Sequence, residues 1–167
     1  MRALVILLLL PVVAQNACKG AGAPTNSTHP AEDVSPYAKA EAKRTAFFDA
    51  VQRADVSRIE SMASQGFDVN AANEGGVTPL MVAAGMNADV AKLLIAKGAR
   101  VNAKTSGGYT ALMSAALNGR KDAIKLLLDS GADPAAKDTS NRTAMKYAAE
   151  KNHKDIVDLL RQGGARE

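Results

Sequence analysis

Apolar residues fall into pairs of short helical patterns that recur along most of the chain. The stretch 107–131 contains one pair, with apolar positions spaced as on one helix face over 110–117 and again over 121–128. Nearly the same text precedes it at 75–98 and follows it at 140–164. A period of 32 to 33 residues therefore predicts an architecture of stacked helical repeats.

The connectors between the pairs share turn and capping residues. A threonine opens each pair, at Thr78, Thr110 and Thr143, and can cap the helix that follows it. The residue two positions earlier is Gly76, Gly108 or Asn141. Because glycine and asparagine tolerate positive φ, each connector is predicted to contain a tight turn at that position.

Small and large apolar residues alternate in a way that suits close helix packing. The first helix of each pair carries two alanines and the second carries two leucines, as in Ala115-Ala116 and Leu126-Leu127. One pair cannot bury its apolar face alone, so neighbouring pairs must supply the other wall of the core. Both leucines are predicted to fill that core, and Leu126→Ala is expected to cost about 2–5 kcal/mol.

A degenerate first repeat precedes the three clear ones. Ser35 is predicted to cap its first helix, with Pro36 at the first helical position. Residues 45–51 align with the opening of the later repeats. Arg58 and Ser61 stand where the other repeats have apolar residues, as expected for a wetter outer face at the end of a stack.

The pattern Thr-Pro-Leu-x-x-Ala-Ala, a turn, Leu-Leu and Gly-Ala-x-Val-Asn-Ala, seen almost complete at 78–103, resembles the ankyrin repeat. The resemblance covers 45–165. It implies an all-α solenoid of about four stacked helix pairs with β-hairpin-like fingers, in repeats of about 36–71, 72–103, 104–136 and 137–167. The usual histidine after Thr-Pro-Leu is replaced by Met81, Met113 and Lys146, and the usual asparagine of the last repeat by Ala135.

The N-terminal residues read as a targeting segment. Residues 1–17 have a basic start, a short apolar run and small residues after it, as a secretory signal does. The run is shorter than the ~20 residues of a membrane span. Cleavage after Ala14 and cleavage after Ala17 both fit. We therefore expect an exported protein, in the periplasm of a bacterium.

Cys18 is the single cysteine of the chain, so no internal disulfide can form. Ala17-Cys18 resembles the cleavage site of a bacterial lipoprotein signal, which implies lipidation of Cys18, although Gln15 and Asn16 depart from that pattern. The alternatives are a free thiol or removal with the signal. If Cys18 is lipidated, Lys19 is not the aspartate that retains such proteins at the inner membrane, and the outer membrane is expected. Residues 18–35 are rich in Gly, Ala, Pro, Ser and Thr and are predicted to form a flexible linker.

Side chains suited to catalysis are scarce. The two histidines are His29 in the linker and His153 in a helix–helix turn, and no metal-binding spacing surrounds them. The glycine pairs at 75–76 and 107–108 are turn residues, not a phosphate loop. We expect no enzyme activity, no cofactor and no metal. The net charge of +4 comes from interspersed Lys, Arg, Asp and Glu without a basic block, which argues against nucleic-acid binding.

What remains is a binding surface, and the resemblance implies where it lies. Ankyrin-repeat proteins dock partners on the finger tips and the adjoining faces of the first helices. By alignment these positions are Glu74, Val77, Met86, Ser106, Tyr109, Leu117, Asn118, Thr139, Arg142, Glu150 and Lys151. The apolar members are predicted to form a centre and the charged members a flank. Alternatively, Met86 and Leu117 merely cover helix ends and Tyr109 packs on the neighbouring finger.

The sequence thus favours a non-catalytic protein-binding module of the bacterial cell envelope. A monomer is implied by family behaviour, and contact with a membrane is expected only through a lipid on Cys18. An alternative is an inhibitor or immunity protein that covers the active site of a periplasmic effector enzyme. A second class, an enzyme, would require turnover that one polar substitution abolishes.

Overall fold

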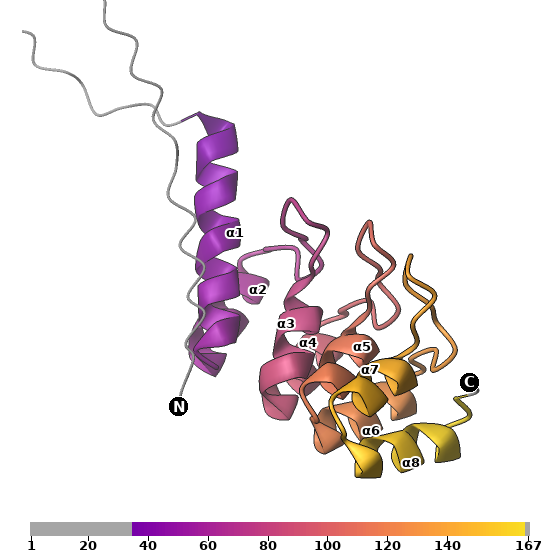
Figure 1. Ribbon diagram of the computed structural model, residues 1–167. Coiled ribbons are helices and arrows are strands. Elements are labelled where there is room, and N and C mark those ends of the chain that lie inside the picture. The colour runs from indigo at the N-terminus through magenta and orange to yellow at the C-terminus, as the bar shows by residue number, and fades with distance from the viewer. Residues whose placement is uncertain (1–34, 166–167) are drawn as a thin grey trace, which may run out of the picture. The chain divides into compact units, whose positions relative to one another are not determined.

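Residues 35–165 are described by a computed structural model, and within this range the chain forms eight α-helices and no strand (Figure 1). The helices are α1 Pro36–Gln52, α2 Val56–Ser64, α3 Pro79–Met86, α4 Ala88–Ala96, α5 Ala111–Leu117, α6 Lys121–Asp129, α7 Ala144–Glu150 and α8 Lys154–Gln162. The prediction of an all-α repeat solenoid is confirmed. The predicted signal at 1–17, Cys18 and the linker up to residue 34 lie outside the described residues.

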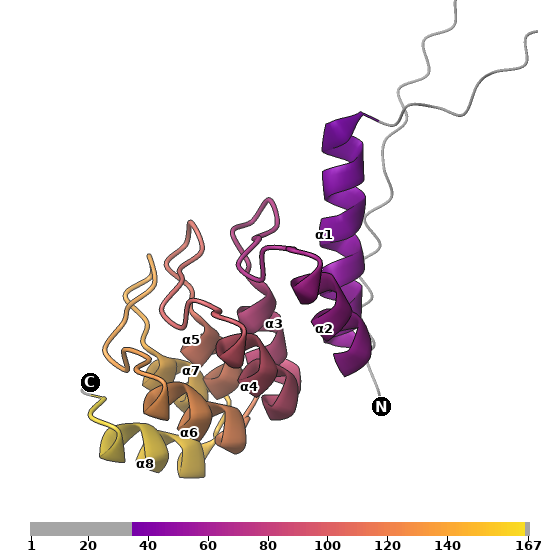
Figure 2. The same ribbon diagram turned by 180° about the vertical axis from the view of Figure 1, so that it is seen from behind.

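The helices form two rows. The odd-numbered helices α1, α3, α5 and α7 pack in sequence order, and each also packs on the even-numbered helix that follows it. Three long connectors project from the stack on one side, as both views show (Figures 1 and 2). We call these connectors the first finger (67–77), the second finger (99–109) and the third finger (132–142).

Threonine caps begin the three regular repeats, as predicted. The hydroxyl of Thr78 accepts a hydrogen bond from the N–H of Met81, and Thr110 and Thr143 make the same bond three residues ahead. All three threonines are buried. At α1, Pro36 occupies the first turn as predicted, but the prediction of a Ser35 cap is wrong, because Ser35 makes no side-chain capping bond.

Alanines allow the odd helices to approach closely. Ala83, Ala84, Ala115, Ala116 and Ala148 are fully buried between neighbouring repeats. Protein interiors are packed as densely as organic crystals. A larger side chain at these positions would therefore force neighbouring repeats apart. The small residues therefore fix the spacing of the stack.

The leucine pairs divide between two environments. Leu127 is fully buried, whereas Leu126 is only partly buried against the core. The other two pairs, 93–94 and 159–160, show the same split. The prediction that both leucines fill the core was therefore wrong for the first of each pair: on α6 the buried face is formed by Ala123, Ile124 and Leu127, and Leu126 lies at the edge of that face. We therefore expect Leu127→Ala, rather than Leu126→Ala, to lower the free energy of unfolding by about 2–5 kcal/mol.

The first repeat ends the stack with a longer helix. α1 has 17 residues, whereas α3, α5 and α7 have 7 or 8. Its N-terminal half extends on the side of the fingers (Figures 1 and 2). Phe47 of α1 is buried and stacks on Phe67 with ring centroids 4.5 Å apart. Arg58 and Ser61 on α2 are exposed, as predicted for a wetter end.

Each helix pair closes with the same turn. A glycine with φ between 83° and 93° follows α2, α4, α6 and α8, at Gly66, Gly98, Gly131 and Gly164. In all four turns the glycine N–H donates to the carbonyl three residues back, and the next N–H donates to the carbonyl five residues back. This is the usual way to satisfy the free carbonyls at a helix end.

Asparagines of the fingers fasten two of these turns to the preceding repeat. Asn70 donates to the carbonyl of Gly98 (3.1 Å) and accepts from the N–H of Arg100 (2.7 Å). Asn102 bonds in the same way to Gly131 (2.8 Å) and Asp133 (2.8 Å). Each asparagine thus clamps one finger onto the turn of the next repeat.

The fingers also contact each other through backbone. The hydrogen bonds N–H of 73 to O of 77, 105 to 109 and 138 to 142 close the three hairpin-like tips. Gly76 and Gly108 have φ of 75° and 76°, and an added Cβ would lie 3.2 Å and 3.0 Å from backbone atoms of the next finger. At the third finger the equivalent residue is Asn141, with φ of 60°. A side chain is accommodated there because no further finger packs against it among the described residues.

Ala135 occupies the position of Asn70 and Asn102 in the last repeat, so the turn at Gly164 has no clamp. The local backbone is the same, because the N–H of Ala135 donates to Asp133 as the N–H of Asn70 donates to Asp68. We expect Ala135→Asn to form the missing bond to Gly164 and to raise the free energy of unfolding by about 0.5–1.5 kcal/mol, measured by urea denaturation.

The matched control for this substitution is Ala135→Asp. Aspartate has the shape of asparagine but cannot donate to a carbonyl. Equal effects of the two substitutions, or a loss of stability with Ala135→Asn, would contradict the proposed equivalence of the three positions.

Candidate functional site

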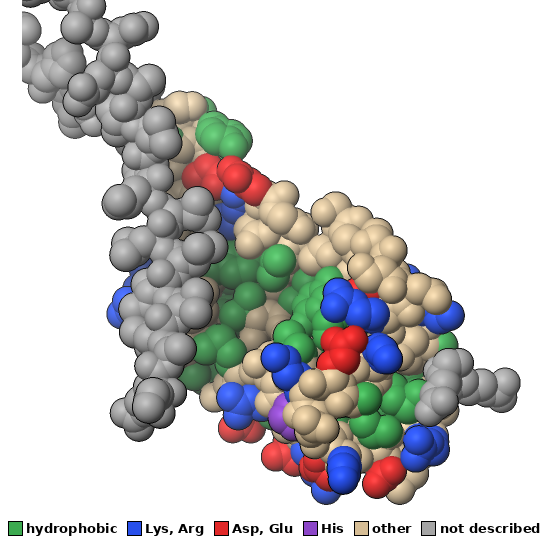
Figure 3. Space-filling view, viewed as in Figure 1, with side chains coloured by type: hydrophobic (Ala, Val, Ile, Leu, Met, Phe, Trp, Pro, Cys, Tyr) green, Lys and Arg blue, Asp and Glu red, His purple; other side chains and the backbone are tan. Residues whose placement is uncertain are grey.

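The fingers, α1 and the odd helices border a hollow on one face of the stack. Figure 3 shows hydrophobic side chains gathered between α1 and the middle of the stack, with basic and acidic side chains nearer to α7. At the α1 end, a cleft of about 500 Å³ lies between α1 and the tip of the first finger. It is lined by Glu41, Arg44, Thr45, Phe48, Gln52, Asn73, Glu74 and Gly75.

The apolar residues predicted for the binding surface differ in exposure. Met86, at the end of α3, is 48% exposed and is among the most exposed large apolar side chains of the described residues. Val77 and Leu117 are partly buried and pack against the core. The alternative view, that Met86 and Leu117 cover helix ends, thus fits Leu117 better than Met86.

The polar residues predicted for the surface lie at its rim. Glu74, Ser106 and Thr139 are exposed at the three finger tips, and Asn118, Glu150 and Lys151 are exposed at the ends of α5 and α7. Thr139 also joins two fingers, because its N–H donates to the carbonyl of Gly107 (2.9 Å). The Asn118 side chain donates to the carbonyl of Ser114 (2.8 Å), which orients it along α5.

The structure brings two predicted residues, Tyr109 and Arg142, into one cluster with two others. The ring of Tyr109 meets the ring of Tyr147 edge to face, with centroids 5.5 Å apart. Arg142 lies over the Tyr147 ring, 4.4 Å from its centroid, and its guanidinium bonds to the Asp138 carboxylate at 3.1 Å. The Tyr147 hydroxyl donates to the same carboxylate at 2.7 Å. A more distant ion pair, at 4.0 Å, joins Arg142 to Glu150.

Asp138 and Tyr147 were not predicted as site residues. Alignment of the repeats shows the signal, because Tyr147 stands four residues after its capping threonine, where the earlier repeats have Val82 and Ser114. An aromatic ring at a position that is otherwise small or aliphatic indicates an added contact. Here the contact ties the third finger to α7, since Asp138 belongs to the finger and Tyr147 to the helix.

The cluster shifts the protonation of both partners. The hydrogen bond from Tyr147 and those from backbone N–H groups hold the pKa of Asp138 at about 2, and its side chain is only 5% exposed. Burial, followed by the hydrogen bond to Asp138, raises the pKa of Tyr147 to about 12. The hydrogen bond between the ionised carboxylate and the neutral phenol contributes to both shifts.

The arrangement offers a preformed surface. No group of His, Cys, Asp and Glu side chains within 35–165 could hold a metal ion. None of the described helices is long and apolar enough to cross a membrane. The described hollow presents apolar side chains, one aromatic–arginine cluster and a polar rim, which is the composition of many protein interfaces.

A family model described as ankyrin repeats (3 copies) matches residues 25–105, 47–138 and 105–166. The chain belongs to the ankyrin-repeat family. No curated protein was found to match it. Ankyrin repeats are generally protein–protein interaction modules, and the ankyrin fold is typically non-catalytic.

The cluster of this ankyrin-repeat protein predicts a defined acid sensitivity. Because the folded-state pKa of Asp138 is lowered from 3.8 to about 2, its contribution to stability is complete above about pH 4 and is lost as the pH falls through about 2. We expect Asp138→Asn to flatten this part of the pH dependence, measured as the urea midpoint at a series of pH values. Tyr147→Phe removes one of the hydrogen bonds that lower the pKa of Asp138, so it should narrow the pH range over which stability falls. A pH dependence of the urea midpoint that runs parallel to that of the wild type would contradict the assignment.

Proposed function

We propose that this ankyrin-repeat protein binds a protein partner in the hollow beneath its fingers, outside the cytoplasm of a bacterium. The observation that carries the proposal is the combination of an exposed apolar side chain, Met86 at the end of α3, with polar side chains exposed at the finger tips and at the ends of α5 and α7, which no other part of the described chain covers. Tyr109 and Arg142 supply two residue types that are enriched at interface hot spots.

Rigidity supports binding with little loss of entropy. The clamps of Asn70 and Asn102, the contacts of Gly76 and Gly108, and the Tyr147 cluster fix all three fingers before any partner arrives. A surface that is already ordered avoids the cost of immobilising side chains and loops on association. The partner can therefore dock largely as onto a rigid body.

The proposed location comes from the sequence of the N-terminal segment. Residues 1–17 have the character of a secretory signal, and Cys18 stands where a lipoprotein would be lipidated. A linker over 18–35 would then hold the repeats near a membrane and raise their effective concentration toward partners there.

The binding surface is tested by a charge placed in the hollow. Met86→Glu should reduce capture of protein partners from a bacterial envelope extract at least about tenfold, because an interface centre tolerates an unpaired charge poorly. Thermal stability should change by less than about 1 kcal/mol, since Met86 is half-exposed.

Val56→Glu is the matched control, because Val56 is 43% exposed but lies at the start of α2 in the other row of helices. The Val56→Glu variant should capture as much partner protein from the extract as the wild type does. If both variants bind as the wild type does, the partner uses a different face.

The location is tested by Cys18→Ser in the full-length chain. If Cys18 carries a lipid, the wild type should fractionate with membranes and the variant should be soluble, because two acyl chains anchor a protein stably whereas none does. Cell fractionation followed by immunoblotting measures this. A wild type found only in the soluble periplasmic fraction would rule out lipidation while leaving export intact.

A further inference from the structure

Four turns within residues 35–165 share the same backbone hydrogen bonds, and two of them show what such a turn binds. In the turns at Gly98 and Gly131, the carboxamide of an asparagine from the preceding finger fills the site. It donates to the glycine carbonyl and accepts from the N–H two residues later. A primary carboxamide is the group that can do both at once.

The first turn has the same backbone hydrogen bonds, but no side chain of residues 35–165 clamps it. The carbonyl of Gly66 and the N–H of Asp68 correspond to the two atoms that are bonded by asparagine in the next two repeats. Neither atom has a side-chain hydrogen bond to any residue that the structure describes, and the described residues include no finger before this turn. α1 stands there instead, and it brings no asparagine.

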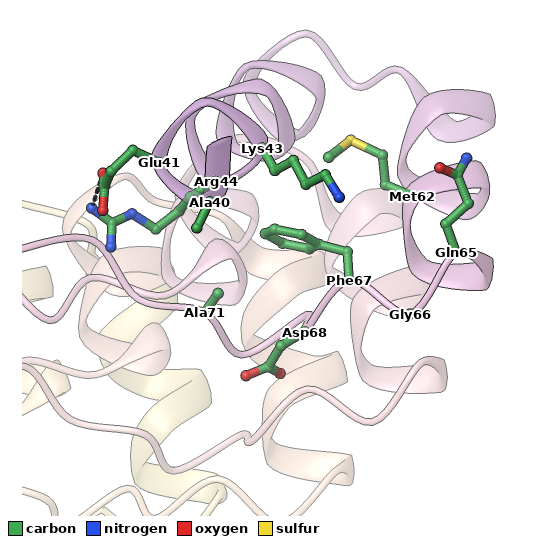
Figure 4. A pocket seen from close by; sticks show the side chains of 10 residues that line it. All are labelled: Ala40, Glu41, Lys43, Arg44, Met62, Gln65, Gly66, Phe67, Asp68 and Ala71. Carbon is green, nitrogen blue, oxygen red and sulfur yellow. Dashed lines mark hydrogen bonds and ion pairs between the residues drawn. The ribbon is translucent and has the colours of Figure 1, made fainter. Parts of the chain in front are cut away.

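A cleft of about 380 Å³ opens beside this turn (Figure 4). It lies between the N-terminal half of α1 and the turn itself, and its lining includes Gly66 and Asp68. Figure 4 shows Phe67 and Met62 projecting from the turn side toward α1, with Lys43 reaching across from α1. Ala40 and Ala71 join Phe67 and Met62 in an apolar part of the lining that would accept an aliphatic side chain, whereas the rest of the lining is polar and would suit a carboxamide.

We propose that this cleft is a second docking site, which takes a partner loop that presents an asparagine or glutamine carboxamide next to an aliphatic residue. The carboxamide repeats the internal clamp at Gly66 and Asp68, and the aliphatic side chain enters the space beside Phe67. The internal clamps have this composition, because Val69 precedes Asn70 and Val101 precedes Asn102.

The fourth turn does not offer an equivalent site. Gly164 also lacks a clamp, because the position that would supply one is Ala135. The clefts at that end of the stack are lined by residues of the third finger, α7 and α8, and Gly164 is not among them. A turn carbonyl without an adjoining cleft gives a carboxamide little to hold it in competition with water.

A peptide that copies the internal clamp tests the proposal. The probe is a synthetic peptide of residues 99–105 with blocked ends, added to the ¹⁵N-labelled protein up to about 5 mM, because so few contacts predict millimolar affinity. The amide signals of Phe67 and Asp68 should shift in a saturable manner. A peptide with Asn102→Ala should bind about tenfold more weakly, since it loses both hydrogen bonds.

Two protein variants locate the site. Ala40→Trp fills the cleft from the exposed surface of α1 and should abolish the shifts, whereas Ala42→Trp, also exposed on α1 but outside the cleft, should leave them unchanged. The proposal is overturned if no signal of 66–68 shifts, if shifts are confined to Gly164 and its neighbours, if the alanine peptide binds equally well, or if Ala40→Trp binds as the wild type does.

Discussion

The packing of one helix pair on the next is the interaction on which this protein depends. Helices of seven to nine residues are too short to persist in water by themselves. They are stable here because Ala83, Ala84, Ala115 and Ala116 are small and allow neighbouring repeats to pack closely around a shared core. The fingers, the hollow and the clefts are all held in place by that contact between repeats.

The ends of such a stack need substitutes for missing neighbours, and this chain uses a different one at each end. At the first repeat, α1 is extended and Phe67 stacks on Phe47, where the later repeats have a buried alanine after the glycine. At the last finger, Asp138 and Tyr147 replace the support that another finger would give. The substitute at the first end leaves an open cleft, whereas the one at the last finger forms part of the proposed binding surface.

Much of the fold could be predicted because it repeats. Three repeats show the same threonine caps, turn glycines and helix pairs, so each of these predictions rested on three independent stretches of sequence. What escaped prediction happens once. Tyr147 and Asp138 lie nine residues apart and meet only because finger and helix fold together, and Leu126 was misplaced because the sequence does not show which of two adjacent leucines faces inward. The candidate site was predicted as a set of positions, but its cluster was visible only in three dimensions.

The central claim, that each repeat owes its structure to its neighbours, is tested most directly by circular dichroism of the isolated third repeat. A peptide of residues 104–136 contains α5, α6 and the finger tip, together with every local signal for them. The account predicts the spectrum of an unfolded chain and no cooperative thermal transition, because no adjacent repeat covers the apolar face. A helical spectrum that melts cooperatively would contradict it.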